Sequence, residues 1–167
     1  MESHLFIPDK LAYVKGDKPQ VKCILCAINE KDPKVTKLDI YHTDHFIVSL
    51  NLYPYNPGHL MIFPKKHLID PRQLSDEQVL ELNNLTTMTL NIIEKLYSPN
   101  GFNVGYNIGY VSGASIEHLH LHVIPGYKNE IGLIDIIGNA RVIVEDPNKT
   151  LKKFKEAFKN FRAVWLE

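Results

Sequence analysis

The chain contains 167 residues, in which 19 Lys and Arg balance 19 Asp and Glu, so its formal net charge at pH 7 is zero. This length suits one domain, over residues 1–167, that buries enough surface to fold without a disulfide scaffold. The charge balance argues against a protein held to nucleic acid or to an anionic membrane by bulk charge, so any anion must be bound locally.

The first residues contain no basic stretch leading into a long apolar run, and no 18 consecutive residues are apolar. We therefore expect a cytoplasmic protein without a membrane span. Further along the chain, Cys23 and Cys26 have a spacing typical of redox dithiols or of half a zinc site. The charged residues 29–37 then indicate a connector.

Two strands are predicted next, over residues 38–42 and 45–51, and a Pro-rich and Asn-rich turn over 53–58 leads into a third strand over 59–64. Ser75 begins a capping box, and apolar residues keep helical spacing until residues 98–101, which contain Pro and Gly. This segment is the one long central helix that the sequence predicts.

The second half of the chain resumes alternation over residues 102–108, and a loop of small residues over 109–115 leads into the histidine segment. A short strand is possible over 141–145. An amphipathic helix is predicted over 149–166, with an apolar face that we assign to core packing: Leu151, Phe154, Phe158, Phe161 and Trp165. Adjacent strands with helices on one side indicate an α+β fold.

The most informative segment is the alternation of His118, His120 and His122 with Leu119 and Leu121. Because a strand has a side-chain period of two, the three imidazoles share one face and the leucines point into apolar packing. Three crowded imidazoles cost free energy through desolvation and mutual repulsion unless a metal or an anion lies among them. The histidine face should therefore look onto a cleft, a metal or solvent.

Residues 118–124 resemble the signature of the histidine triad (HIT) superfamily of nucleotide-binding proteins, in which histidines alternate with apolar residues. Residues 57–67 look like the upstream block of that family, and residues 107–115 look like its phosphate-side loop. These motifs cover about residues 23–127 and leave 128–167 as a C-terminal extension with a helix. Residues 53–59 and 133–143 are similar to the branch with diadenosine tetraphosphate phosphorylases and hydrolases.

The resemblance implies a HIT-like α+β fold with an antiparallel sheet of about five strands, one long central helix and a C-terminal helix, assembled as a homodimer. It also implies that a nucleotide, most simply an adenine nucleotide, places its α-phosphate against the triad. His120 would be the nucleophile that forms a nucleotidyl-histidine. His118 completes the catalytic set.

Further roles follow from the same resemblance. His122, His59 and Ser115 would donate hydrogen bonds to phosphoryl oxygens. Asn51 resembles the position that contacts ribose, and Asn107 resembles one on the phosphate side. The alternative for either asparagine is that its side chain satisfies its own backbone near a strand end.

The cysteine pair resembles the one that binds zinc in many members of the family, where two later histidines complete the site. The matching set here is Cys23, Cys26, His67 and His118, a closed and structural zinc site that would hold His118 beside the nucleophile. The alternative is a reduced thiol pair packed as small apolar residues.

Two departures from the family pattern bear on the substrate. Ala114 stands where many members have a Gln that touches the leaving-group oxygen, and residues 125–127 read Pro-Gly-Tyr where members of this branch often have Pro-Arg-Trp. The second change removes a cation that could bind a distal phosphate. The chain therefore fits dinucleoside polyphosphate cleavage, with adenosine phosphoramidate cleavage as the alternative.

Two other classes of function are consistent with parts of the sequence. A metalloenzyme could use the three triad histidines as ligands, although no nearby acidic motif supplies a base. A nucleotide sensor without catalytic activity could retain the pocket and lose turnover.

Overall fold

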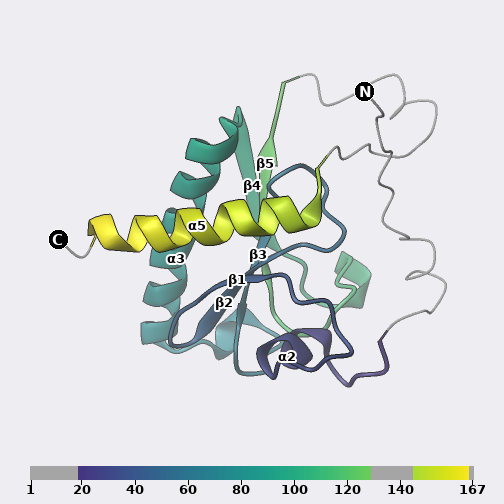
Figure 1. The fold of residues 1–167 in the computed structure, drawn as a ribbon. Coiled ribbons are helices and arrows are strands. Elements are labelled where there is room, and N and C mark those ends of the chain that lie inside the picture. Colours follow the sequence, from purple (N-terminus) through teal and green to yellow (C-terminus); the bar gives the residue numbers. More distant parts are fainter. Residues whose placement is uncertain (1–18, 129–144, 166–167) are drawn as a thin grey trace.

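One antiparallel sheet organises the chain, whose computed structural model describes residues 19–128 and 145–165 (Figure 1). Its five strands lie in the order β1-β2-β3-β5-β4, and every neighbouring pair is antiparallel. The elements along the chain are α2 (Ile24–Asn29), β1 (Asp39–His42), β2 (Phe46–Leu50), β3 (Leu60–Pro64), the 3-10 turn η1 (Pro71–Gln73), α3 (Asp76–Tyr97), β4 (Gly101–Tyr106), the 3-10 turn η2 (Tyr110–Ser112), β5 (Leu121–Gly126) and α5 (Pro147–Trp165).

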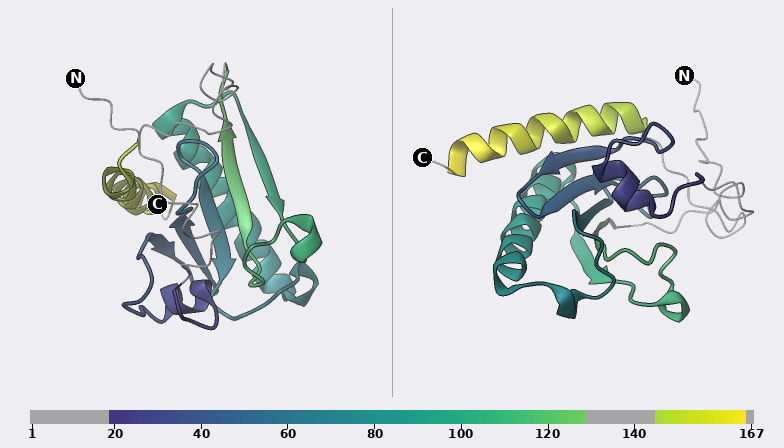
Figure 2. Two further views of the ribbon diagram at one scale, coloured as in Figure 1. Left: turned by 90° about the vertical axis from the view of Figure 1, so that its right-hand side faces the viewer. Right: turned by 90° about the horizontal axis from the view of Figure 1, so that it is seen from below.

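Helices cover both faces of the sheet, and not one side as the sequence indicated, because α2 was not predicted; two separate apolar clusters show this. On one face, α3 and α5 pack against the side chains of Phe46, Val48, Ile62 and Val123. On the other face, α2 packs against Ile47, Met61 and Phe63, which alternate with the first set along β2 and β3. Figures 1 and 2 show α3 running along the strands and α5 running across them. Because both faces are covered, every residue of β2 and β3 is buried.

Strand register places the histidine segment on the face that carries α2. Met61 of β3 is paired with His122 of β5, and Met61 belongs to the cluster under α2. Leu121 and Val123 point to the opposite face and join the cluster under α3 and α5. The predicted alternation of polar and apolar faces is therefore confirmed at these positions.

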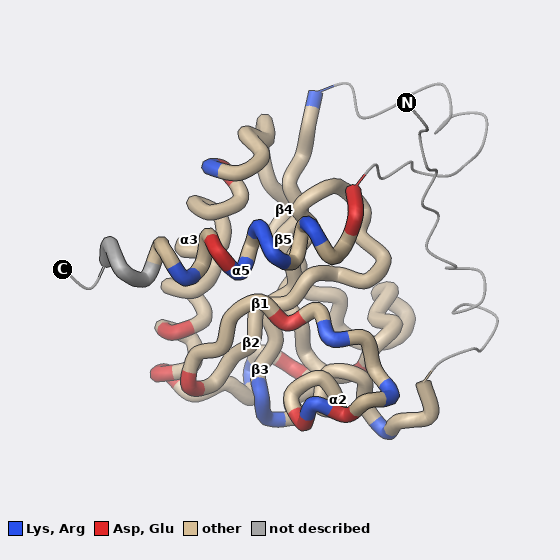
Figure 3. Tube along the Cα trace, in the orientation of Figure 1, with Lys and Arg blue, Asp and Glu red and all other residues tan. Residues whose placement is uncertain are grey.

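The α+β architecture with five antiparallel strands, a long central helix and a C-terminal helix is confirmed. The capping box at Ser75 is formed, with Gln78 N–H donating to the Ser75 hydroxyl and the Gln78 side chain returning to the Ser75 N–H. Helix α5 buries Phe154 and Phe158 fully, and its lysines at positions 149–159 are exposed. Figure 3 shows where lysines occur along the helix. The side chain of Trp165 and most of the possible strand over 141–145 lie outside the described residues.

Two segments differ from the predictions. Residues 24–29 form a helix at a place where only the cysteine pair and the start of a connector were recognised. The predicted histidine strand begins only at Leu121, so His118 and His120 lie in the segment before β5. That segment is held instead by the Leu119 N–H, which donates to the Leu68 carbonyl at 2.6 Å.

The helices of the described ranges include none whose length and apolar character would allow it to cross a membrane. That residues 1–167 make one domain stays a prediction.

Candidate active site and metal centre

A cavity of about 290 Å³ lies on the face of the sheet that carries α2. This volume is close to the lower end of small-molecule pockets, about 300 Å³. Its walls are mostly apolar, and four polar side chains of the predicted site or triad line it: Asn51, Ser115, His120 and His122. The cavity therefore combines an apolar compartment with one group that the resemblance assigns to the ribose, Asn51, and three that it assigns to phosphate chemistry, Ser115, His120 and His122.

His120 is held in one tautomer by the backbone. Its Nδ1 lies 2.8 Å from the carbonyl oxygen of His118, which can only accept, so Nδ1 carries the proton and Nε2 keeps a lone pair. The side chain is 4% exposed, and burial lowers its pKa against the opposing effect of the His118 carbonyl. A neutral imidazole with a free Nε2 is the form that can attack phosphorus.

His59 and His122 form a second chain of hydrogen bonds. The backbone N–H of Tyr55 donates to His59 Nδ1 at 3.1 Å, so a neutral His59 carries its proton on Nε2. That nitrogen lies 3.0 Å from His122 Nδ1, which must accept, and His122 is left with a proton on Nε2. Burial, with the neighbouring histidines, lowers the pKa of His59 to about 3 and of His122 to about 4, so both rings are neutral.

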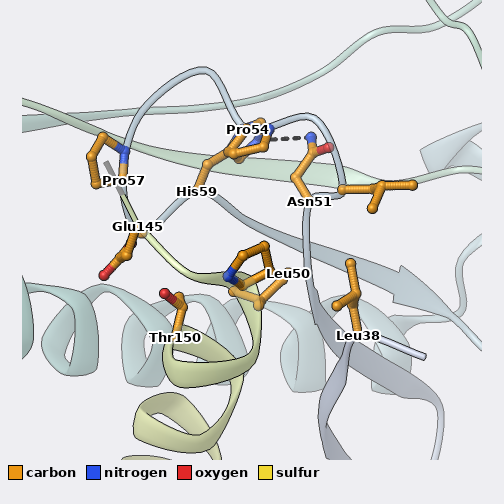
Figure 4. Close-up of a pocket in the computed structure, with 11 residues that line it drawn as sticks. Leu38, Leu50, Asn51, Pro54, Pro57, His59, Glu145 and Thr150 are labelled. Carbon is orange, nitrogen blue, oxygen red and sulfur yellow. Dashed lines mark hydrogen bonds between the residues drawn. The ribbon is translucent and has the colours of Figure 1, made fainter. Parts of the chain in front are cut away.

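Because of these hydrogen bonds, His59 does not lie where the family resemblance led us to expect it. The side chain is 1% exposed, both ring nitrogens face protein groups, and the residue does not line the 290 Å³ cavity. His59 lines instead a separate cavity of about 50 Å³ behind the 53–58 turn, together with Glu145 and Thr150 (Figure 4). Two triad histidines line the 290 Å³ cavity, His120 and His122, and the one whose ring N–H can donate to a ligand is His122, through Nε2.

The two asparagines are placed differently. Asn51 lines both cavities, and its Oδ1 accepts the N–H of Tyr53 at 2.9 Å while its Nδ2 lies 3.3 Å from His59 Nε2 (Figure 4). Asn107 follows β4 and does not line the cavity; a Cβ on Gly113 would lie 4.0 Å from its Nδ2. Ser115 lines the cavity and is exposed.

The predicted metal ligands come together from three parts of the chain. The ligand atoms of Cys23, Cys26, His67 and His118 lie within 4.8 Å of one another. The two sulfur atoms lie 3.3 and 3.4 Å from His118 Nδ1, and Cys26 Sγ lies 3.4 Å from His67 Nδ1. Donor separations near 3.4–3.8 Å are roughly the edges of a tetrahedron with bonds of about 2.1–2.3 Å.

The hydrogen bonds around these ligands also fit a metal. His118 Nε2 donates to the Pro64 carbonyl at 2.8 Å, which leaves the Nδ1 lone pair facing the thiols. Burial and the adjacent Cys23 raise the pKa of Cys26 to about 11, so without a metal Cys26 is a protonated thiol crowded against Cys23. A cation among the four donors would relieve this crowding. The residues present could hold one metal ion.

Helix α2 is the part of the site that sequence reasoning missed. Its residues Ile24, Leu25 and Ile28 line the cavity. The only local signal was the pair of apolar residues between the cysteines, which is too short to predict a helix. Tyr55 was also missed, and its ring stacks on His59 with centroids 5.4 Å apart.

Known proteins resemble this chain in sequence and in fold. Over 95 residues it is 44% identical to an AP-4-A phosphorylase of Mycobacterium tuberculosis, a segment that is 56% of this chain and 49% of that protein. It is 30% identical to a HIT-like protein of Methanocaldococcus jannaschii, over 80% of this chain and 98% of the other. An adenosine 5'-monophosphoramidase of Schizosaccharomyces pombe is 30% identical over 68% of this chain and 80% of its own length.

Among solved structures, a zinc-bound histidine triad family protein from Mycobacterium smegmatis superposes with a TM-score of 0.70 at 21% identity, over 86% of this chain and 97% of the other. The chain spans about half the length of the mycobacterial phosphorylase. Residues 32–129 match the HIT domain family. This match covers more than half of the chain and includes the triad, and the chain therefore belongs to the HIT domain family.

Proposed function

We propose that this protein is an enzyme that cleaves nucleoside phosphoanhydrides at the α-phosphate through a nucleotidyl-histidine on His120. The observation that carries the proposal is the 2.8 Å contact between His120 Nδ1 and the His118 carbonyl, which leaves the Nε2 lone pair unprotonated on a buried side chain that lines the cavity. A serine at this place would need a separate base to become comparably reactive.

The reaction has two steps. His120 Nε2 attacks the α-phosphorus and forms a P–N bond while the P–O bond to the leaving phosphate group breaks and that oxygen keeps the electron pair. Water or inorganic phosphate then attacks the same phosphorus and forms a new P–O bond, while the P–N bond breaks and its electron pair returns to His120 Nε2. Where water is the acceptor its proton passes to solvent, and His120 is again the neutral ring that began the cycle. The Nε2 proton of His122 and the hydroxyl of Ser115 are directed to the oxygens where negative charge grows, and removing one such donor costs about 3 kcal/mol in barrier.

Other residues act around this centre. We assign His59 to the orientation of His122, because its own nitrogens are engaged by Tyr55 and His122. We assign Asn51 to the ribose, with Nδ2 as the group it can donate, because its Oδ1 already accepts from Tyr53. Asn107 stays on the phosphate side by resemblance alone. The nucleoside would occupy the apolar compartment beside α2.

The favoured substrates are dinucleoside polyphosphates such as diadenosine tetraphosphate. Support comes from the 44% identity to the AP-4-A phosphorylase, against 30% to the phosphoramidase. The position where members of this branch often carry a cation that could bind a distal phosphate is Gly126 here, which has no charged side chain. Adenosine phosphoramidate is therefore the second candidate substrate.

Product analysis with diadenosine tetraphosphate, with and without inorganic phosphate, tests this function. ADP plus ATP formed only with phosphate indicates a phosphorylase, and AMP plus ATP in water indicates a hydrolase. Two ADP in water would contradict attack at the α-phosphate. Tight AMP binding without cleavage of this substrate or of an adenosine phosphoramidate would favour the sensor.

We also propose that the metal bound by Cys23, Cys26, His67 and His118 is zinc, because two thiolates and two imidazoles in a closed tetrahedral set favour that ion. Zinc would supply structural rigidity there. We expect about one zinc per chain, and Cys23→Ser should abolish it. Protein purified without chelator and free of zinc would remove the assignment.

The rival in which the triad histidines themselves bind a catalytic metal is disfavoured. In the described ranges, the only group of three or more potential ligands is the cysteine and histidine set. His118 Nδ1 faces that set and His120 Nδ1 faces a carbonyl. Turnover that survives EDTA would agree with this assignment, and turnover restored only by added metal in Cys23→Ser would oppose it.

A homodimer is the assembly we propose. Strand β4 is an edge of the sheet, with Val104 44% exposed, and the segment after it exposes Ile108 by 43%, Tyr110 by 90% and Val111 by 98%. An open strand edge beside exposed apolar side chains is typical of an interface with another chain. Light scattering should give twice the chain mass; the mass of one chain would contradict the proposal.

A further inference from the structure

Helix α2 belongs to two sites at once. Cys23 is its N-cap residue and Cys26 lies in its first turn, and both sulfur atoms face His118. From the same six residues, Ile24, Leu25 and Ile28 form part of the wall of the 290 Å³ cavity. The position of this one helix therefore determines where two of the four metal donors lie and where part of the apolar wall of the cavity lies.

The helix has little stability of its own. It has six residues, whereas isolated helices shorter than about 12 residues are marginal in water. The Cys23 side chain makes no capping hydrogen bond, and the first turn holds no acidic residue. Apart from the metal donors, α2 is held by the burial of Leu25, Ala27 and Ile28 against the sheet and by one long hydrogen bond, 3.5 Å, from Asn29 Nδ2 to the Lys65 carbonyl.

The phosphate end of the cavity is built differently. His122 lies in β5, which is hydrogen-bonded to β3 on one side and to β4 on the other. His120 is held by the His118 carbonyl, and the His118 ring keeps its own hydrogen bond to Pro64. These contacts do not involve α2. Release of the helix would open the apolar compartment and leave the histidines in place.

We propose that occupancy of the Cys23, Cys26, His67 and His118 metal site controls nucleoside affinity by holding α2 against the sheet as a wall of the cavity. The proposal rests on the proposed function, since it takes the apolar compartment as the nucleoside site. The metal then determines the fraction of molecules in which α2 is docked and the compartment is closed. If α2 is docked only about a tenth of the time without metal, the apparent Kd for a nucleoside rises about tenfold.

The test compares metal-loaded protein with chelator-treated protein, using adenosine, AMP and pyrophosphate as separate probes in calorimetry. Loss of the metal should weaken the binding of adenosine and of AMP by the same factor, about tenfold or more. The affinity for pyrophosphate should stay within about twofold of its value with metal bound. Hydrogen exchange should accelerate at residues 24–29 and stay unchanged in β2 and β3. Cys26→Ser and His67→Asn should reproduce the effect from opposite ends of the site.

Two further variants keep the test decisive if metal-free protein is unstable. Ile28→Ala keeps all four metal-binding residues. In metal-loaded protein it should weaken the binding of adenosine but not the binding of pyrophosphate. His42→Ala removes an imidazole on β1 that lines neither the cavity nor the metal site, and should change nothing.

Equal adenosine affinity with and without metal would overturn the proposal. So would a loss of pyrophosphate affinity, on removal of the metal, as large as the loss of adenosine affinity. A different result would count against the nucleotide site itself: metal-loaded protein that binds none of the three probes. In that case the exchange rates at residues 24–29 would still decide whether the metal holds α2.

Discussion

At the scale of single residues, His118 connects the two halves of the site through three different atoms. Its Nδ1 faces the thiols, its Nε2 donates to the Pro64 carbonyl, and its backbone oxygen accepts from His120. The residue that the sequence assigns to both metal binding and catalysis therefore needs no second conformation for the two roles. Its main chain orients His120, the proposed nucleophile, and its side chain is one of the four donors of the proposed metal site.

The role assigned to His59 predicts that its two hydrogen bonds matter more than its ability to carry charge. His59→Leu removes the donor to His122 Nδ1 and should lower kcat by at least about tenfold, with little change in KM, because His122 loses its fixed tautomer. His59→Gln can accept from Tyr55 and donate to His122, so it should recover much of that loss. Steady-state kinetics of both variants measure the effect. Equal impairment of the two variants, or a change confined to KM, would contradict the orienting role.

At the scale of elements, the sequence correctly predicted the helices and strands that are marked by signals within a few residues of chain. Helix α3 is marked by a capping box at Ser75 and by apolar residues at helical spacing, both readable within a few residues of chain. Helix α2 carries no such signals, and its helical form follows from burial against Ile47, Met61 and Phe63, which are distant in sequence. Tertiary contacts of this kind cannot be read from a six-residue window.

The histidine segment shows the same distinction. Alternation correctly assigned Leu119, Leu121 and Val123 to the buried side. It could not show where strand pairing begins, because that depends on partners in β3 and β4. For the same reason the metal ligands were matched through family resemblance, and spacing alone left the cysteine pair undecided.

The C-terminal end of α3 predicts a stabilising substitution. Ser98 caps the helix in the left-handed conformation, with φ 47°, which costs free energy for any residue with a Cβ. Ser98→Gly should raise the free energy of unfolding by about 0.5–1 kcal/mol. Urea unfolding measures this free energy. At the N-terminal end of α3, Ser75→Ala should lower the free energy of unfolding by about 1 kcal/mol. A destabilised Ser98→Gly would show that the serine side chain contributes more than the strain costs.

At the scale of the whole molecule, buried neutral histidines make stability depend on pH. The pKa of His59 is lowered to about 3 and that of His122 to about 4, from 6.5, mainly by burial. Between these values and 6.5 the unfolded chain binds more protons than the folded one, so stability falls as pH decreases from about 6.5 toward 4. Thermal unfolding at constant ionic strength should show Tm falling across this window.

His59→Gln is the matched control for that pH dependence. It removes one titrating ring and should flatten the slope of Tm against pH between about 6.5 and 4. A slope unchanged from the native protein would mean that groups other than His59 govern the acid transition.

The account as a whole depends on a covalent bond between His120 and phosphorus, so the most direct measurement is to trap it. Protein mixed with diadenosine tetraphosphate, quenched during turnover under alkaline denaturing conditions that preserve P–N bonds, is digested and analysed by mass spectrometry. We predict an adenylyl group on the peptide that contains His120, absent in His120→Ala. Turnover without that adduct, or an adduct on another residue, would contradict the account.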